Sequence, residues 1–149
     1  MRGAQAQRGW SAVSQPSHVR AEELLAAAHQ AAEKAYAPFS GFRVGAAILT
    51  RSGKVFTGCN VENSSYGLTN CAERTAIFSA VAAGQLSAEY ELEAVAVVNH
   101  EGAICSPCGA CRQVIFEFGP EATVIFRAHN GQMVELTARD LLPEGFRLR

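Results

Sequence analysis

The sequence lacks the features that mark membrane-spanning, secreted and nucleic-acid-binding proteins. It contains no apolar run of the roughly 18 residues that a bilayer-spanning helix needs. Residues 1–17 lack the continuous apolar stretch of a secretory signal, so we do not expect export. There is no lysine-rich or arginine-rich run, and the net charge is only -1. We therefore expect neither a nucleic acid nor a membrane as a partner.

A disulfide framework is also not expected. The chain has five cysteines, an odd number, in a sequence without an export signal. This combination is typical of a reducing compartment, which favours a cytoplasmic protein whose thiols are free or bound to a metal.

The length and composition indicate a globular protein with one core. At 149 residues, 48% of them hydrophobic and 18% charged, the chain has the size of a single ordinary domain. We expect residues 1–16 to form a loosely ordered N-terminal extension and residues 17–149 to form the domain.

Hydrophobic periodicity and turn residues predict alternating helices and strands. Ser17 is a candidate cap for a first helix that includes Tyr36 and ends before Pro38. We predict helices at 17–37, 72–83, 109–118 and 137–142, and strands at 42–50, 54–61, 92–98, 123–128 and 133–136. This order predicts an α/β protein, a three-layer α/β/α sandwich with a mixed five-stranded sheet.

Two cysteines three positions apart raise the question of chemistry. In "SPCGAC", Cys108 and Cys111 have the spacing of either a redox pair or half of a metal site. "CAER" adds a third cysteine, Cys71, followed two positions later by the acid Glu73. A redox pair needs neither addition, so a metal site is favoured.

Three thiolates leave one position open on a tetrahedral zinc ion, as in catalytic sites, whereas structural sites close it with a fourth ligand. Cys59 and Cys105 are the candidates for a fourth ligand. Neither has a partner at ligand spacing, and a free cysteine commonly behaves as a small buried apolar residue. We favour the open site, and a structural four-cysteine zinc protein stays as the alternative.

Both cysteine motifs begin predicted helices, whose N-termini lower thiol pKa values and offer N–H groups to sulfur. Arg74 and Arg112 each follow a motif and could either donate to a thiolate or lie solvated on a helix. Glu73 lies where a carboxylate could take a proton from a water at the open metal position.

Ordered motifs along the chain carry a family resemblance. With "YAPFSGFRVGAAILT", "GCNVENSSYGLTNCAERTAI", "SPCGACRQVIFEFG" and "ELTARDLLPEGF", the chain resembles the small homotetrameric zinc-dependent cytidine deaminases over nearly its whole length after residue 17. The resemblance implies hydrolytic deamination of cytidine and 2′-deoxycytidine to uridine and 2′-deoxyuridine, with release of ammonia, in pyrimidine salvage. It also implies one zinc ion per chain.

The resemblance assigns roles at the reacting centre. It implies that Cys71, Cys108 and Cys111 bind zinc. It further implies that Glu73 shuttles protons, first to N3 and then to the leaving amine, while hydroxide generated at zinc adds to C4 of the base.

For the substrate, the resemblance implies that Asn60 and Glu62 bind the ribose 3′-hydroxyl and that the backbone N–H of Ala72 contacts the base. Phe42 resembles an aromatic wall beside the pyrimidine, and Phe146 resembles one supplied across a subunit boundary.

The family's quaternary structure implies that the loop carrying Ser64 and Tyr66 reaches a neighbouring active site within a homotetramer.

Two other deaminase classes compete with the cytidine deaminases as an interpretation of the sequence. "NVEN" and "CAER" argue against an enzyme acting on a cytosine-containing antibiotic. The absence of a cationic run argues against an enzyme that edits polynucleotides.

Overall fold

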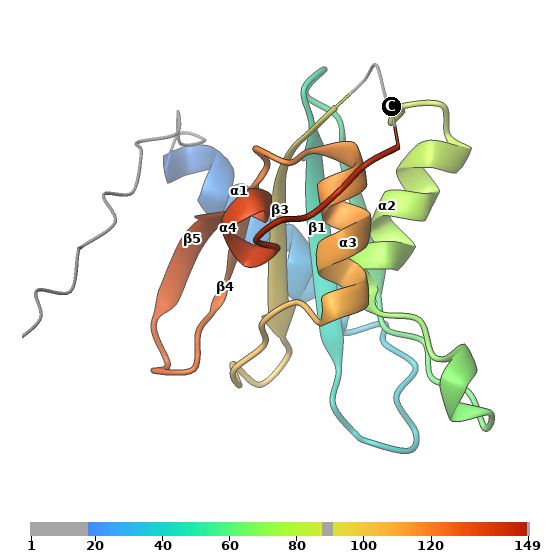
Figure 1. The fold of residues 1–149 in the computed structure, drawn as a ribbon. Coiled ribbons are helices and arrows are strands. Elements are labelled where there is room, and N and C mark those ends of the chain that lie inside the picture. The colour runs from blue at the N-terminus through green and yellow to red at the C-terminus, as the bar shows by residue number, and fades with distance from the viewer. Residues whose placement is uncertain (1–17, 88–90, 149) are drawn as a thin grey trace, which may run out of the picture.

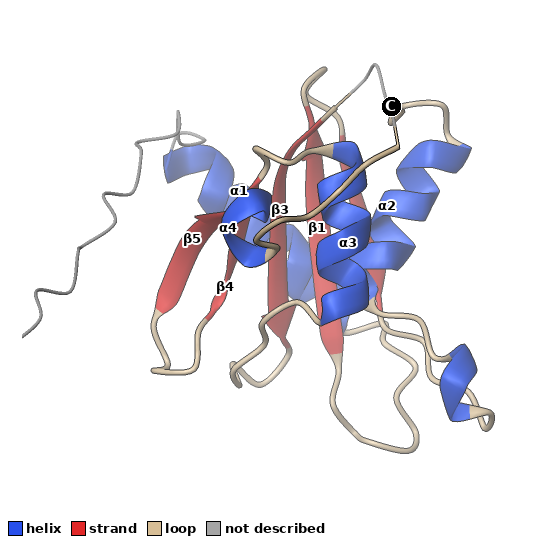
Figure 2. Cartoon of the chain, in the orientation of Figure 1, coloured by secondary structure: helices blue, strands red, loops and turns tan. Residues whose placement is uncertain are grey.

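The computed structural model describes residues 18–87 and 91–148 (Figure 1). Along the chain lie α1 (His18–Ala32), β1 (Val44–Thr50), β2 (Val55–Cys59), the short 3₁₀-helix η1 (Tyr66–Leu68), α2 (Ala72–Ala82), β3 (Leu92–Asn99), α3 (Gly109–Phe118), β4 (Thr123–Arg127), β5 (Met133–Thr137) and α4 (Ala138–Leu141) (Figure 2). The predicted order of helices and strands is confirmed. The extension predicted at 1–16 and the Ser17 cap lie outside the described residues.

The five strands form one mixed sheet in the order β2-β1-β3-β4-β5. β3 and β4 run parallel and are joined through α3, while the other neighbouring strands are antiparallel. Two of the antiparallel pairs, β1–β2 and β4–β5, are hairpins. The predicted mixed sheet is therefore confirmed.

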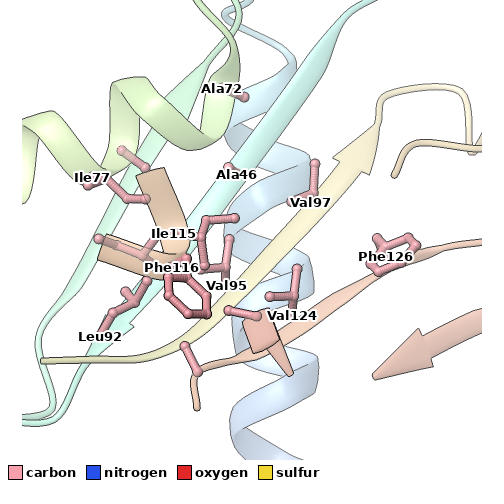
Figure 3. Packing of buried hydrophobic residues seen from close by; sticks show 14 of the residues in the cluster. Ala46, Ala72, Ile77, Leu92, Val95, Val97, Ile115, Phe116, Val124 and Phe126 are labelled. Atoms are coloured by element: carbon pink, nitrogen blue, oxygen red, sulfur yellow. The ribbon is translucent and has the colours of Figure 1, made fainter. Parts of the chain in front are cut away.

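Helices cover both faces of the sheet, with α1 behind it and α2, α3 and α4 in front in Figure 1. Alternate residues of each central strand face opposite layers, as the pleat requires. In β1, Ala46 and Ile48 belong to the cluster on the α2 and α3 side, whereas Ala47 and Leu49 belong to the cluster with α1. Figure 3 shows the larger cluster, where Val95 and Val97 of β3 meet side chains of α2 and α3. This is the predicted three-layer sandwich.

The largest boundary error concerns α1, which ends at Ala32 and does not continue to Tyr36. The strand predicted at 54–61 is also too long, because β2 ends at Cys59. Tyr36 instead pairs with Val61 in an isolated bridge, and its side chain is 57% exposed. The Tyr36 amide donates to the Asn60 carbonyl at 3.0 Å, and the Glu62 amide donates to the Tyr36 carbonyl at 2.8 Å. The extended backbone that this pairing needs excludes a helical conformation at Tyr36.

Two local features hold the helices in place. Thr137 caps α4, because Thr137 and Asp140 form a reciprocal capping box at the start of this helix. Gly58 of β2 lets α2 approach the sheet closely, since a Cβ at this position would lie 2.4 Å from the Ala76 nitrogen. Among the described helices, none is long and apolar enough to span a membrane.

Candidate metal centre and active site

Three cysteines meet where two helices begin at the same end of the molecule. The N-termini of α2 and α3 both lie at the lower end of Figure 1, near the loop that carries η1. Cys71 is the N-cap residue of α2, and Cys108 is the N-cap residue of α3. Cys111 lies in the first turn of α3 and is fully buried. The fold thus brings "CAE" next to "PCGAC", although Cys71 and Cys108 are 37 positions apart in the sequence.

The spacing of the sulfur atoms fits a tetrahedral zinc ion. The Sγ atoms of Cys71, Cys108 and Cys111 all lie within 4.8 Å of one another. Those of Cys71 and Cys108 are 3.8 Å apart. A Zn–S bond of about 2.3 Å in a tetrahedron gives an S···S separation of roughly 3.8 Å. These three cysteines are positioned to bind zinc.

Neighbouring groups stabilise negative charge on the sulfur atoms. Arg74 donates from Nη2 to Cys71 Sγ at 3.2 Å, and the backbone N–H of Cys111 donates to Cys108 Sγ at 3.5 Å. Hydrogen bonds from Cys111 and then Arg74 lower the pKa of Cys71 to about 5. The same contact with Cys71, together with burial, raises the pKa of Cys111. The hydrogen bonds around Cys71 therefore favour the thiolate form of this cysteine.

The two remaining cysteines lie apart from this group. Cys59 Sγ approaches the Lys34 carbonyl at 3.6 Å, on the α1 side of β2. Cys105 is buried in the larger hydrophobic cluster, and burial raises its pKa to about 12. Among the residues that the structure describes, the metal-binding group contains neither of them. The arrangement is that of the open site rather than the closed four-cysteine site.

Glu73 lies in the first turn of α2 and is only 4% exposed. Its Oε2 accepts a hydrogen bond from Cys111 Sγ at 3.5 Å. Burial raises the pKa of Glu73, because a carboxylate is less stable out of water. A carboxyl group with a raised pKa beside a metal centre can take up and return a proton near neutral pH.

The two arginines have different surroundings. Arg74 contacts a cysteine sulfur, and this ion-pair-like contact raises its pKa. Arg112 donates from Nε to the Pro107 carbonyl at 2.9 Å and from Nη1 to the Leu141 carbonyl at 3.1 Å. Among the described hydrogen bonds Arg112 therefore contacts backbone rather than sulfur, and it ties the turn before Cys108 to α4.

The segment 60–62 carries an amide and a carboxylate, and its Val61 pairs with Asn70, the residue before Cys71. Asn60 Oδ1 accepts from the Val44 amide, and its Nδ2 donates to the Phe42 carbonyl, both at 2.8 Å. Glu62 Oε1 accepts from the amides of Phe39 and Ser40 at 2.9 and 3.1 Å. Hydrogen bonds, with the largest contribution from the Ser40 side chain, lower the pKa of Glu62 below its usual value.

Several of the other predicted site residues are exposed on this chain. Phe42 lies just before β1 and is one of the exposed aromatic residues. Phe146 follows α4, and its side chain is 68% exposed. The backbone carbonyl of Phe146 accepts a hydrogen bond from the Gln113 side chain of α3 at 3.3 Å. Ser64 and Tyr66 lie on the exposed loop around η1, and Tyr66 makes an edge contact with the ring of Phe39.

Ala72, by contrast, is fully buried at the start of α2, between Cys71 and Glu73. Sequence reasoning missed the part played by Phe39 and Ser40, whose amides hold Glu62. The turn-forming stretch "FSGF" contains both residues and was the available signal.

Comparison with known proteins decides the family. Residues 19–127 match the cytidine and deoxycytidylate deaminase zinc-binding region. The chain belongs to this family. It is accordingly a zinc-dependent deaminase, with Cys71, Cys108 and Cys111 as the group positioned to bind the metal.

Relatives of this deaminase cover most of its length. It is 47% identical over 126 residues to the cytidine deaminase of Sporosarcina psychrophila, covering 84% of this chain and 90% of the relative. The crystal structure of cytidine deaminase from Burkholderia pseudomallei is 54% identical with a TM-score of 0.75, covering 84% of this chain and 98% of that one. Cytidine deaminase from Mycobacterium tuberculosis is 43% identical with a TM-score of 0.73, covering 85% and 97%.

Proposed function

We propose that this protein hydrolyses free cytidine and 2′-deoxycytidine to uridine and 2′-deoxyuridine, releasing ammonia, as a step of pyrimidine salvage. The observation that carries the proposal is the buried carboxyl group of Glu73 beside the group formed by Cys71, Cys108 and Cys111. The names of the relatives, cytidine deaminases that align over most of the chain, support the choice of substrate.

In the proposed mechanism, zinc supplies Lewis acidity, which makes a nucleophile from water available at neutral pH. Glu73 accepts the proton of the attacking water and passes it to N3 of the cytosine ring. It then takes the proton of the hydroxyl group added at C4 and delivers it to the amino group, which leaves as ammonia while the C4 carbonyl forms. The raised pKa of Glu73 suits a group that must hold the proton between these two transfers.

We propose that the nucleoside lies between this centre and the segment 60–62. Glu62 and Asn60 bind the ribose 3′-hydroxyl, because a carboxylate accepts and an amide donates. Phe42 forms a wall beside the pyrimidine, and the backbone N–H of Ala72 contacts the base. The amides of Phe39 and Ser40 support the assignment of Glu62, because they fix the carboxylate that the sugar needs.

We also propose that the protein assembles as a homotetramer in the cytoplasm and that each active site is shared between subunits. Tyr66 and Phe146 are 74% and 68% exposed, which is high for aromatic side chains at a substrate site. A neighbouring subunit would cover them, with Phe146 completing the aromatic enclosure and the loop of Ser64 and Tyr66 reaching the next active site. Free thiols at the cysteines fit a reducing compartment.

The test is ammonia release by the zinc-loaded protein from cytidine, deoxycytidine, cytosine, cytidine monophosphate and a cytosine oligonucleotide. Turnover of the two nucleosides with little activity on the others is the expected result. Activity confined to the oligonucleotide would overturn the proposal in favour of a polynucleotide-editing enzyme. Inactivity on the whole panel, with zinc bound, would direct the search to cytosine-containing antibiotics.

A further inference from the structure

A short ladder of backbone hydrogen bonds connects the segment 60–62 to the residue before the zinc ligand Cys71. Val61 pairs with Tyr36 on one side and with Asn70 on the other. The Val61 amide donates to the Asn70 carbonyl at 2.9 Å, and the Asn70 amide donates to the Val61 carbonyl at 3.0 Å. The backbone of Asn70 is therefore hydrogen-bonded to the segment that carries Asn60 and Glu62.

The side chain of Asn70 continues this connection into α2. Its Nδ2 donates to Thr75 Oγ1 at 3.1 Å, and the Thr75 hydroxyl donates to the Cys71 carbonyl at 3.2 Å. One hydroxyl has one hydrogen to donate, so accepting from Asn70 leaves that hydrogen for Cys71. The Cys71 carbonyl also accepts from the Thr75 amide at 3.1 Å.

The sheet holds Thr75 from its other side. A Cβ built on Gly58 of β2 would lie 2.9 Å from Thr75 Cβ, so the threonine side chain rests directly on the strand. Cys71 has no helix-capping hydrogen bond to its own side chain, unlike Cys108. In the described hydrogen bonds, the Cys71 carbonyl accepts from the amide and the hydroxyl of Thr75, and Asn70 holds that hydroxyl.

We propose that Asn70 and Thr75 are positioning residues for the zinc ligand Cys71, and that they couple its placement to the segment 60–62. Neither residue contacts the sulfur atoms in the described hydrogen bonds. They act through the carbonyl of Cys71 and through the backbone of Val61. Partners that orient a metal ligand from one shell further out commonly change metal affinity or activity by about 10-fold to 100-fold when they are removed.

The experiment measures zinc affinity by competition between zinc-loaded protein and a chromogenic chelator. Thr75→Val keeps the branched shape but removes the hydroxyl, and we expect zinc to bind about tenfold more weakly. Thr75→Ser keeps the hydroxyl and is expected to retain zinc affinity close to that of the parent. Asn70→Ala, outside the helix, is expected to weaken zinc binding and to raise KM for cytidine.

The matched control is Ser79→Ala. The Ser79 hydroxyl donates to the Thr75 carbonyl at 2.8 Å, which is the same kind of bond one turn further from the metal. Circular dichroism of every variant verifies folding. Parent-like zinc affinity in both Thr75→Val and Asn70→Ala would overturn the proposal. So would a double variant whose loss equals the sum of the two single losses, because residues acting through one chain of contacts are not additive.

The coupling to segment 60–62 rests on the proposed function, whereas the effect on zinc does not. If the variants lose zinc but the parent never deaminates cytidine, the proposed substrate fails and the positioning role stands. If the parent deaminates cytidine and the variants keep their zinc and their KM, the positioning role fails alone.

Discussion

Arg74 Nη2 donates to Cys71 Sγ at 3.2 Å, one helical turn after the cysteine that begins α2. Three thiolates around a divalent ion carry a formal charge of about -1, which weakens the acidity that zinc confers on water. The guanidinium offsets part of that charge. We expect Arg74→Gln to weaken zinc binding about tenfold, measured by chelator competition. Arg139→Gln, which removes an exposed arginine paired with Glu121, is the control and should leave zinc affinity unchanged.

The close contact of α2 with β2 gives a second prediction. Gly58→Ala places a methyl group against backbone atoms of Ala72 and Ala76, which cannot move without shifting the helix. We expect the free energy of unfolding to fall by about 1–3 kcal/mol in urea denaturation. Thr57→Ala, an exposed neighbour on the same strand, should change it by less than about 0.5 kcal/mol. Equal stability of the two variants would mean that α2 does not need this close approach.

The open metal site predicts a division among the cysteines. Replacing Cys71, Cys108 or Cys111 by serine should abolish stoichiometric zinc, as measured by atomic emission on purified protein. Cys59→Ser and Cys105→Ala should each retain one zinc ion per chain. Loss of zinc from either of the last two would instead support a closed structural site.

The carboxylate of Glu62 gives a prediction about substrate binding. Glu62→Ala removes the acceptor held by the amides of Phe39 and Ser40, so we expect KM for cytidine to rise at least about tenfold while zinc content is unchanged. The parent should show a similar loss with 3′-deoxycytidine, which lacks the hydroxyl that we propose Glu62 binds. If the parent enzyme has the same KM for cytidine and 3′-deoxycytidine, the assignment of Glu62 to the substrate site is wrong.

The sequence predicted the sheet and the helices because their signals are local. The apolar runs at 44–50 and 92–99 had to be buried on both faces, and Thr137 and Asp140 formed the capping box that their spacing allows. The predicted end of the first helix was wrong because no residue near Tyr36 in the sequence indicates that Tyr36 pairs with Val61. That pairing is a tertiary contact, which overrides the helical periodicity of the segment.

The candidate site was predictable to a similar extent. The cysteine motifs named the metal-binding group, but a linear sequence could not distinguish the two arginines. Arg74 faces Cys71, whereas Arg112 faces the carbonyls of Pro107 and Leu141. The amide of Asn70 and the hydroxyl of Thr75 also carry no motif by themselves, and only the folded chain brings them together.

The most direct test of the proposed chemistry compares the parent with Glu73→Gln at matched zinc content. The substitution keeps the size of the side chain and removes its ability to accept and return a proton. Ammonia release from cytidine should fall by at least about a hundredfold while zinc stays bound. A Glu73→Gln variant that retains zinc and keeps most of the parent's turnover would contradict the assignment of Glu73 as the proton shuttle.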